Sequence, residues 1–428
     1  MGQNKWLGGS LGGDGIVYGV PGHAKSVLRI DPKTMEVSTF GGPFHGKFKW
    51  LRGVTARNGN VYAIPCYADT ILKIDTQTGD ASTFGGPFPG EWKWHGGVLG
   101  RDGCIYGIPC NHDRVLKVNP ETEEVELIGP SFEGRNKWYG GLLAGDGCVY
   151  GVPANANAVL KINPETQEVT TFGELPEGGW KWHGGVVGPD GNVYGIPSNS
   201  DFVLKIDVYQ GTVKEIGGRL EGGRHRSDGK YKFLGGVVGR DGAIYGMPGD
   251  AEQVLRIDCS TETVSVHGGP FLERMNKWQN GFVAPDGNIY GIPLRHPSVL
   301  KIVTGPSPPA IHSSVQRGEV GSAGVPLTLS QTTTHSEKGG SGGQDGGVVV
   351  LSDAEGQKET AGPSSSTLVN GGESVSADPV GRSESFVEVS VVGGPFPGID
   401  HWEGGVVAPD GSLFCMPLRA KKVLRIGP

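Results

Sequence analysis

Residues 181–207 read KWHGGVVGPDGNVYGIPSNSDFVLKID, and versions of this stretch recur along most of the 428-residue chain. An aromatic residue opens each copy, and the openings are Trp6, Trp50, Trp94, Trp138, Trp182, Phe233, Trp278 and Trp402. The first five openings are 44 residues apart, and the next intervals are 51, 45 and 124 residues. A fixed period of this length is typical of a tandem-repeat fold, so the repeat unit predicts the architecture.

Each repeat predicts four short strands. Asp190-Gly191 separates the first two, and Asp-Gly favours a tight hairpin because both central residues of a type I′ turn need positive φ. Asn192–Pro197 and Val203–Asp207 are rich in β-branched and aromatic residues, as strands are. An Asx-Pro turn such as Asn163-Pro164 precedes the fourth strand. Four strands in about 44 residues predict a propeller blade, and the Gly and Pro breaks exclude a helical solenoid.

The chain holds eight copies of the first three strands but seven of the fourth. We therefore expect an all-β protein, a β-propeller of eight four-stranded blades. The eighth blade has three strands, unless the chain is part of a longer product. A seven-bladed propeller with one unclosed repeat is the alternative. Residues 1–302 contain blades one to seven, the last in part, and residues 386–428 complete blade seven and form blade eight.

An insertion at residues 303–385 interrupts the seventh repeat. It contains no Phe, Tyr or Trp and carries 4 Lys or Arg against 9 Asp or Glu, which accounts for −5 of the net charge of −7. Such a segment buries too little apolar surface to offset the entropy of ordering it, so we expect a disordered loop. It is either a tolerated surface insertion or a segment for phosphorylation or partner binding.

Composition limits the partners. The acidic balance argues against nucleic-acid binding, and no apolar run reaches the roughly 18 residues that span a bilayer. The first residues contain no apolar region of a secretory signal. Six cysteines without C-x-x-C or zinc spacing indicate free thiols in a reducing compartment. We therefore expect a cytoplasmic monomer that binds neither nucleic acid nor membrane.

Residues shared by all repeats first suggest structural roles. The tryptophans are expected to pack between blades, and the Gly-Gly pairs to allow crowding on the innermost strand. Lysine precedes the aromatic residue in seven repeats, including Lys93, Lys137 and Lys181. A ring of such cations near the channel mouth would attract an anionic ligand. The alternative is that each lysine stabilises its own blade.

Positions that vary between repeats point to a ligand site. His95, Tyr139 and His183 follow the aromatic residue in three adjacent blades, where they are predicted to line a pocket or to serve as structural residues. The loop after the second strand is neutral to acidic in blades two to six and basic in the last two, through Arg295 and Arg419. This division suits a polar or charged ligand, and it also suits an ordinary solvated rim.

The motifs Val-Leu-Lys-Ile-Asp-Pro-x-Thr and Asp-Gly-x-x-Tyr resemble the blades of virginiamycin B lyase-like and NHL/YVTN-type propellers. The resemblance covers all eight repeats, about 345 residues. For a lyase, it implies a metal-assisted elimination that uses acidic residues and a histidine near the channel mouth. His401-Trp402-Glu403 is the stretch of this sequence that offers such residues.

Two functions follow as hypotheses. The first is a non-enzymatic propeller without a cofactor, which binds a protein or a polar or anionic small ligand at the channel-mouth face. The alternative is a lyase- or lactonase-type enzyme with a divalent cation such as Mg²⁺ or Ca²⁺ at the channel mouth. Carboxylates from separate blades would hold that ion, and the candidates are Asp69, Asp113, Asp201, Asp250 and Glu403.

Overall fold

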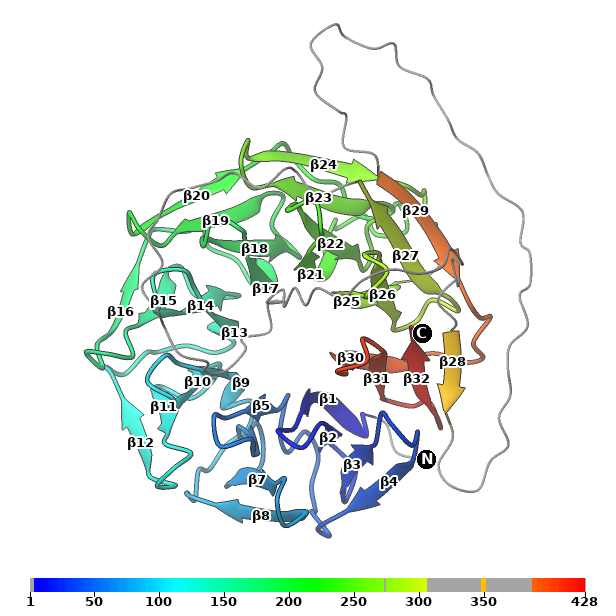
Figure 1. Ribbon diagram of the computed structural model, residues 1–428. Coiled ribbons are helices and arrows are strands. Elements are labelled where there is room, and N and C mark those ends of the chain that lie inside the picture. Colours follow the sequence, from blue (N-terminus) through cyan, green and yellow to red (C-terminus); the bar gives the residue numbers. More distant parts are fainter. Residues whose placement is uncertain (1–3, 273–274, 306–347, 352–386, 428) are drawn as a thin grey trace, which may run out of the picture.

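The computed structural model describes residues 4–272, 275–305, 348–351 and 387–427, with backbone alone for residues 348–351. These residues form eight antiparallel sheets arranged as the blades of a ring (Figure 1). The prediction of an eight-bladed propeller is confirmed, and the seven-bladed alternative is wrong. Within the described part of the chain, no helix is long and apolar enough to cross a membrane.

The first four blades follow the repeat in simple up-and-down order. Blade one contains β1 Trp6–Leu11, β2 Val17–Pro21, β3 Val27–Ile30 and β4 Val37–Phe40. Blade two contains β5 Val54–Thr55, β6 Val61–Ala63, β7 Ile71–Asp75 and β8 Asp80–Phe84. Blade three contains β9 Trp94–Leu99, β10 Ile105–Pro109, β11 Val115–Val118 and β12 Val125–Ile128. Blade four contains β13 Trp138–Leu143, β14 Val149–Pro153, β15 Val159–Ile162 and β16 Val169–Phe172.

The remaining blades continue the ring. Blade five contains β17 Trp182–Val187, β18 Val193–Pro197, β19 Val203–Asp207 and β20 Thr212–Ile216. Blade six contains β21 Phe233–Val238, β22 Ile244–Pro248, β23 Val254–Asp258 and β24 Thr263–His267. Blade seven contains β25 Trp278–Val283, β26 Ile289–Pro293, β27 Val299–Thr304 and β29 Val387–Val392. The eighth repeat supplies β30 Trp402–Val407, β31 Leu413–Pro417 and β32 Val423–Ile426.

Blade eight has three strands of its own, as predicted, and its outer edge is not left bare. Strand β28, Val348–Leu351, pairs antiparallel with β32, so that Val348 lies opposite Ile426 and Leu351 opposite Val423. This strand belongs to the insertion, four residues of which are therefore part of a sheet (Figure 1). The expected loop, 303–385, also begins too early, because Val303 and Thr304 continue β27 and pair with β29. Its residues 306–347 and 352–385 lie outside the described residues.

The repeated aromatic residues hold the blades together, as the sequence predicted. The Trp182 indole donates a hydrogen bond from Nε1 to the Phe202 carbonyl at 3.0 Å, and the same bond spans 20 residues in six other repeats. The apolar core lies between neighbouring blades, because each cluster combines residues of two successive sheets. The ring closes in the same way, with Trp6 packed against Phe414 and Val423.

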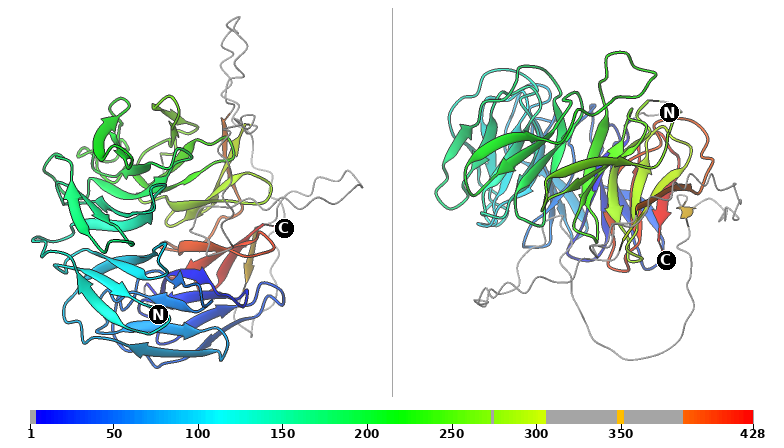
Figure 2. Two further views of the ribbon diagram at one scale, coloured as in Figure 1. Left: turned by 60° about the vertical axis from the view of Figure 1, so that its left-hand side comes forward. Right: turned by 90° about the horizontal axis from the view of Figure 1, so that it is seen from above.

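The innermost strand of every blade faces the central axis (Figure 1), and Figure 2 shows the ring from two further sides with loops on both faces. A bulge follows the first residue of this strand in seven blades. In blade two the strand is reduced to Val54–Thr55 and an isolated bridge between Trp50 and Pro65. The start of the innermost strand therefore brings eight equivalent positions to one mouth of the channel.

Candidate functional site

The second residue after the aromatic residue has a left-handed backbone in every blade. Six repeats place glycine there, with φ between 66° and 80°, at Gly8, Gly96, Gly140, Gly184, Gly235 and Gly404. Arg52 and Asn280 occupy the other two positions, each with φ 59°. The left-handed region costs a residue with a side chain roughly 1–2 kcal/mol, and asparagine tolerates it better than arginine does. Arg52 is therefore the repeat-breaking residue whose backbone is most strained.

The Arg52 side chain is exposed at the channel mouth. It lies across Gly8 of blade one, where an added Cβ would come within 3.1 Å of Arg52 Cγ. In the described part of the chain, no hydrogen bond or ion pair engages its guanidinium group, whereas most other arginines contact a carboxylate or a carbonyl. A strained backbone that presents an unsatisfied cation is the pattern expected of a ligand anchor.

An aromatic wall stands beside Arg52. The ring centroids of His95 and Tyr139 are 3.7 Å apart, and those of Tyr139 and His183 are 4.2 Å apart. His95 is 7% exposed, and its Nδ1 is buried without a hydrogen-bond partner. Burial and then the Arg52 charge lower the pKa of His183 to about 3, and burial lowers the pKa of His95 well below its usual value. Both imidazoles are therefore neutral at pH 7.

A carboxyl group closes the opposite side. Glu403 Oε1 accepts a hydrogen bond from Gln279 Nε2 at 3.4 Å. Burial raises the pKa of Glu403, and the Arg52 charge opposes that shift. A cavity of about 30 Å³ is lined by Arg52, His95, Tyr139, Asn280 and Glu403, among others. This volume suits about one water molecule or one small polar group at the floor of the channel mouth.

We call this set of seven residues from six blades the axial cluster; its members are Arg52, His95, Tyr139, His183, Gln279, Asn280 and Glu403. The structure thus brings together the three aromatic residues that the sequence singled out. It adds Arg52 and Asn280, which sequence reasoning missed. Both interrupt the Gly-Gly pair of the repeat, and that interruption was the observation that would have found them.

The ring lysines are buried rather than displayed. Lys137 Nζ donates hydrogen bonds to the carbonyls of Cys110, His112 and Gly134 at 3.1, 2.9 and 3.0 Å. Lys181 Nζ likewise contacts the Ala156 and Gly178 carbonyls, and Lys93 Nζ contacts the Gly90 carbonyl. The bonds of Lys137 to Cys110 and His112, and of Lys181 to Ala156, tie a blade to the loop of the preceding blade, whereas the bonds to Gly90, Gly134 and Gly178 stay within the segment that enters the lysine's own blade. They favour the structural interpretation, and they give the proposed anion ring no geometric support.

The arginines of the basic loops in blades seven and eight are also held by contacts within the protein. Arg295 Nε lies 2.8 Å from Asp400 Oδ1, and Arg419 Nε lies 3.2 Å from Asp400 Oδ2. The two arginines of blades seven and eight therefore bracket one carboxylate.

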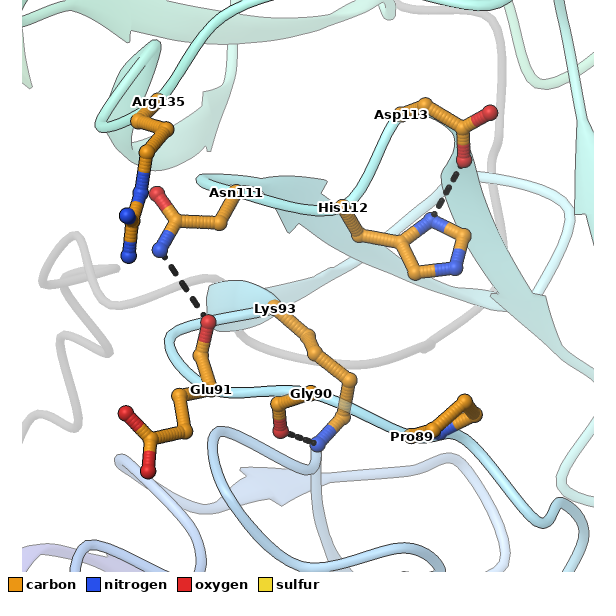
Figure 3. A pocket seen from close by; sticks show the side chains of 8 residues that line it. All are labelled: Pro89, Gly90, Glu91, Lys93, Asn111, His112, Asp113 and Arg135. Carbon is orange, nitrogen blue, oxygen red and sulfur yellow. Dashed lines mark hydrogen bonds and ion pairs between the residues drawn. The ribbon is translucent and has the colours of Figure 1, made fainter.

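A second, larger pocket of about 600 Å³ opens between the loops of blades three and four (Figure 3). His112 stacks on Trp94 with ring centroids 4.3 Å apart, and its Nδ1 lies 3.2 Å from Asp113 Oδ1. The amide of Asn111 donates to the Glu91 carbonyl at 3.1 Å. The polar groups that line this pocket mostly satisfy one another, so it is the weaker candidate.

The carboxylates do not gather into a metal site. Asp201 Oδ1 pairs with Lys232 at 3.0 Å, and Asp250 Oδ2 lies 3.4 Å from both His225 and Arg226. Among the residues that the structure describes, no group of three His, Cys, Asp or Glu side chains has a geometry that would hold a metal ion. The carboxylates of the described residues therefore do not fit a divalent cation.

No protein-family model matches the sequence, and no curated protein matches it. Solved structures do match. A streptogramin B lyase structure aligns with a TM-score of 0.51 at 16% identity, over 68% of this chain and 92% of that chain. Virginiamycin B lyase from Staphylococcus aureus, a catalytically inactive histidine variant with quinupristin, aligns with a TM-score of 0.53 at 16% identity, over 68% and 92%.

A third match comes from a two-component system. The extracellular domain of a putative hybrid two-component system from B. thetaiotaomicron aligns with a TM-score of 0.50 at 12% identity, over 68% of this chain and 39% of that chain. The protein is thus an eight-bladed β-propeller that resembles virginiamycin B lyase and related propellers in structure. Because the same fold occurs in a lyase and in the extracellular domain of a two-component system, the fold does not assign a function.

Proposed function

We propose that this propeller is a non-enzymatic binding protein that takes a small anionic ligand at the channel mouth, with Arg52 as the anchor. The single observation that carries the proposal is the Arg52 backbone, left-handed with φ 59° at a position where six of its seven equivalents are glycine. A glycine there would relieve the strain, so the retained arginine suggests a use for its guanidinium group. Carboxylate and phosphate groups match that group bidentately.

The rest of the axial cluster supports a ligand of limited size. Tyr139 stacks between His95 and His183, so the three rings together form one side of the site, and the unpaired Nδ1 of His95 offers one polar contact. Glu403 and Gln279 offer an acceptor and an amide on the other side. The ligand would place its acid on Arg52 and a planar or polar body against the wall. A reducing compartment such as the cytoplasm belongs to the same proposal, on the basis of six unpaired thiols. A monomeric state is proposed with it.

The test compares two substitutions that relieve the same backbone conformation. Arg52→Gly and Asn280→Gly each restore the residue that the other repeats use, and each should raise the free energy of unfolding, by about 1 kcal/mol for Arg52→Gly and by less for Asn280→Gly. A panel of small carboxylates and phosphate esters is titrated into the wild type and both variants by calorimetry. We expect binding to weaken at least ten-fold in Arg52→Gly and much less in Asn280→Gly. Equal affinity in Arg52→Gly and the wild type, or no saturable binding to the wild type, would refute the proposal.

An enzymatic alternative rests on the same cluster. Glu403, a carboxyl group with a raised pKa, and His95, an imidazole with a lowered pKa, line one cavity. Such opposite shifts are typical of acid–base pairs in lyases and related enzymes. Turnover of a panel ligand, lost in Glu403→Gln while binding persists, would favour this alternative over simple binding.

A further inference from the structure

Strand β28 differs from every other outer strand in how it reaches its sheet. In blades one to six, a turn of four to six residues connects the third strand to the fourth. The Asn163 side chain stabilises one such turn, accepting hydrogen bonds from the Glu165 and Thr166 amides at 2.9 and 3.3 Å. β28 is joined instead through residues 305–347 to β27 and through residues 352–386 to β29. Neither connection leads to β32, the strand with which it pairs.

The edge that β28 covers is formed without it. β32 pairs on its other side with β31, and its apolar side chains are buried against the two neighbouring blades. Val423 packs with blade one, while Leu424 and Ile426 pack with blade seven, all at most 1% exposed. An ordered strand with a row of unpaired backbone groups is an acceptor for another strand.

The long connections on both sides of β28 should make this strand easier to displace than an outer strand that follows a short turn. The shorter connection has 35 residues, about six times the length of a six-residue turn. Closure probability falls with about the 3/2 power of loop length, so the local concentration of β28 is roughly 15-fold lower than that of a turn-linked strand. β28 pairs through four residues, as the outer strands of blades one, three and four do, so the length of its connections is what sets it apart.

Charge defines what fits the edge. Lys421 and Lys422 precede β32, and Arg425 lies within it, where it pairs with Asp410 at 3.6 Å. Asp345 and Asp353 flank the β28 segment in the sequence. We infer that the outer edge of β32 is a strand-acceptor site, which Val348–Leu351 holds as a displaceable resident and which takes in its place an extended β-branched segment with acidic flanks. The inference is independent of the ligand proposed for the axial cluster.

The experiment frees the edge in the full chain. One variant carries Val348→Gly, Val349→Ser, Val350→Gly and Leu351→Ser. The matched control carries Leu368→Gly and Val369→Ser, two apolar residues elsewhere in the insertion. The probe is a fluorescent peptide with the sequence of residues 344–353, QDGGVVVLSD, and a second peptide with proline at the third valine serves as its control. Amide hydrogen exchange and fluorescence anisotropy are the measurements.

In the freed variant, we expect the β32 amides that face β28 to exchange at least ten-fold faster than in the wild type and the matched control. Protection in β14, Val149–Pro153, should stay unchanged, which shows that the ring remains folded. The peptide should bind the freed variant at least ten-fold tighter than the wild type, restore protection in β32, and saturate the wild type at high concentration. Unchanged protection in the freed variant, failure of the peptide to restore it, or equal binding of the proline peptide would refute the acceptor site. No binding to the wild type at saturating peptide would refute displacement.

Discussion

The substitution Lys137→Met tests whether the ring lysines are structural. Lys137 is 3% exposed, and its ammonium group holds the carbonyls of Cys110, His112 and Gly134. Methionine preserves the shape of the side chain but leaves three acceptors without their donor. Each buried carbonyl that loses its donor costs roughly 1–3 kcal/mol, and removal of the buried ammonium charge offsets part of the total cost. We expect the free energy of unfolding to fall by about 3 kcal/mol.

The matched control is Lys161→Met on a third strand. Lys161 pairs with Asp146 at 3.2 Å while about a third of its side chain stays exposed, so its loss should cost less than about 1 kcal/mol. Urea denaturation followed by tryptophan fluorescence gives both values, and titration with phosphate esters at low salt gives any effect on anion binding. A Lys137→Met protein that is as stable as the control but binds anions more weakly would refute the structural interpretation and restore the anion ring.

Two further predictions concern buried ionisable groups. Burial lowers the pKa of His183 to about 3. Between about pH 6.5 and 3 the folded state therefore binds fewer protons than the unfolded state, so the wild type should lose stability as the pH falls through that range. His183→Gln should flatten this loss when unfolding is measured at pH 7 and pH 4.5, and an unchanged slope would contradict the assignment. Asp250 is fully buried, accepts a hydrogen bond from the Asn276 amide at 2.7 Å and faces Arg226. In thermal unfolding, Asp250→Ala should therefore destabilise the protein by about 3 kcal/mol. Asp250→Asn introduces the residue type that the preceding repeat has at Asn199, and it should cost less than half as much.

The repeat pattern made the fold predictable. Asp-Gly hairpins, β-branched strands and the aromatic opening are local features, and most repeats contain all of them within about 44 residues. The structural role of the tryptophans was predictable for the same reason, since Trp182 and its equivalents bond 20 residues downstream in the same blade. The sequence also singled out His95, Tyr139 and His183, because a break in a repeat is visible without coordinates.

Other features depend on distances that a repeat pattern does not contain. The lysines look like a ring of free cations in the sequence, and only the loop of the preceding blade, which encloses Lys137, shows that they are buried. The convergence of Arg52 with Glu403 joins residues about 350 positions apart, and it requires the ring to close first.

The sequence by itself determined eight repeats, their strands and the shortage of one outer strand, because these follow from hydrogen-bonding and packing preferences that act over a few residues. Only the tertiary structure decided that Val348–Leu351 covers the open edge of β32 and that Arg52 meets the axial cluster. Backbone groups on a strand edge pair with any extended segment that reaches them, so the identity of the partner is set by the geometry of the closed ring rather than by the pattern of the partner itself.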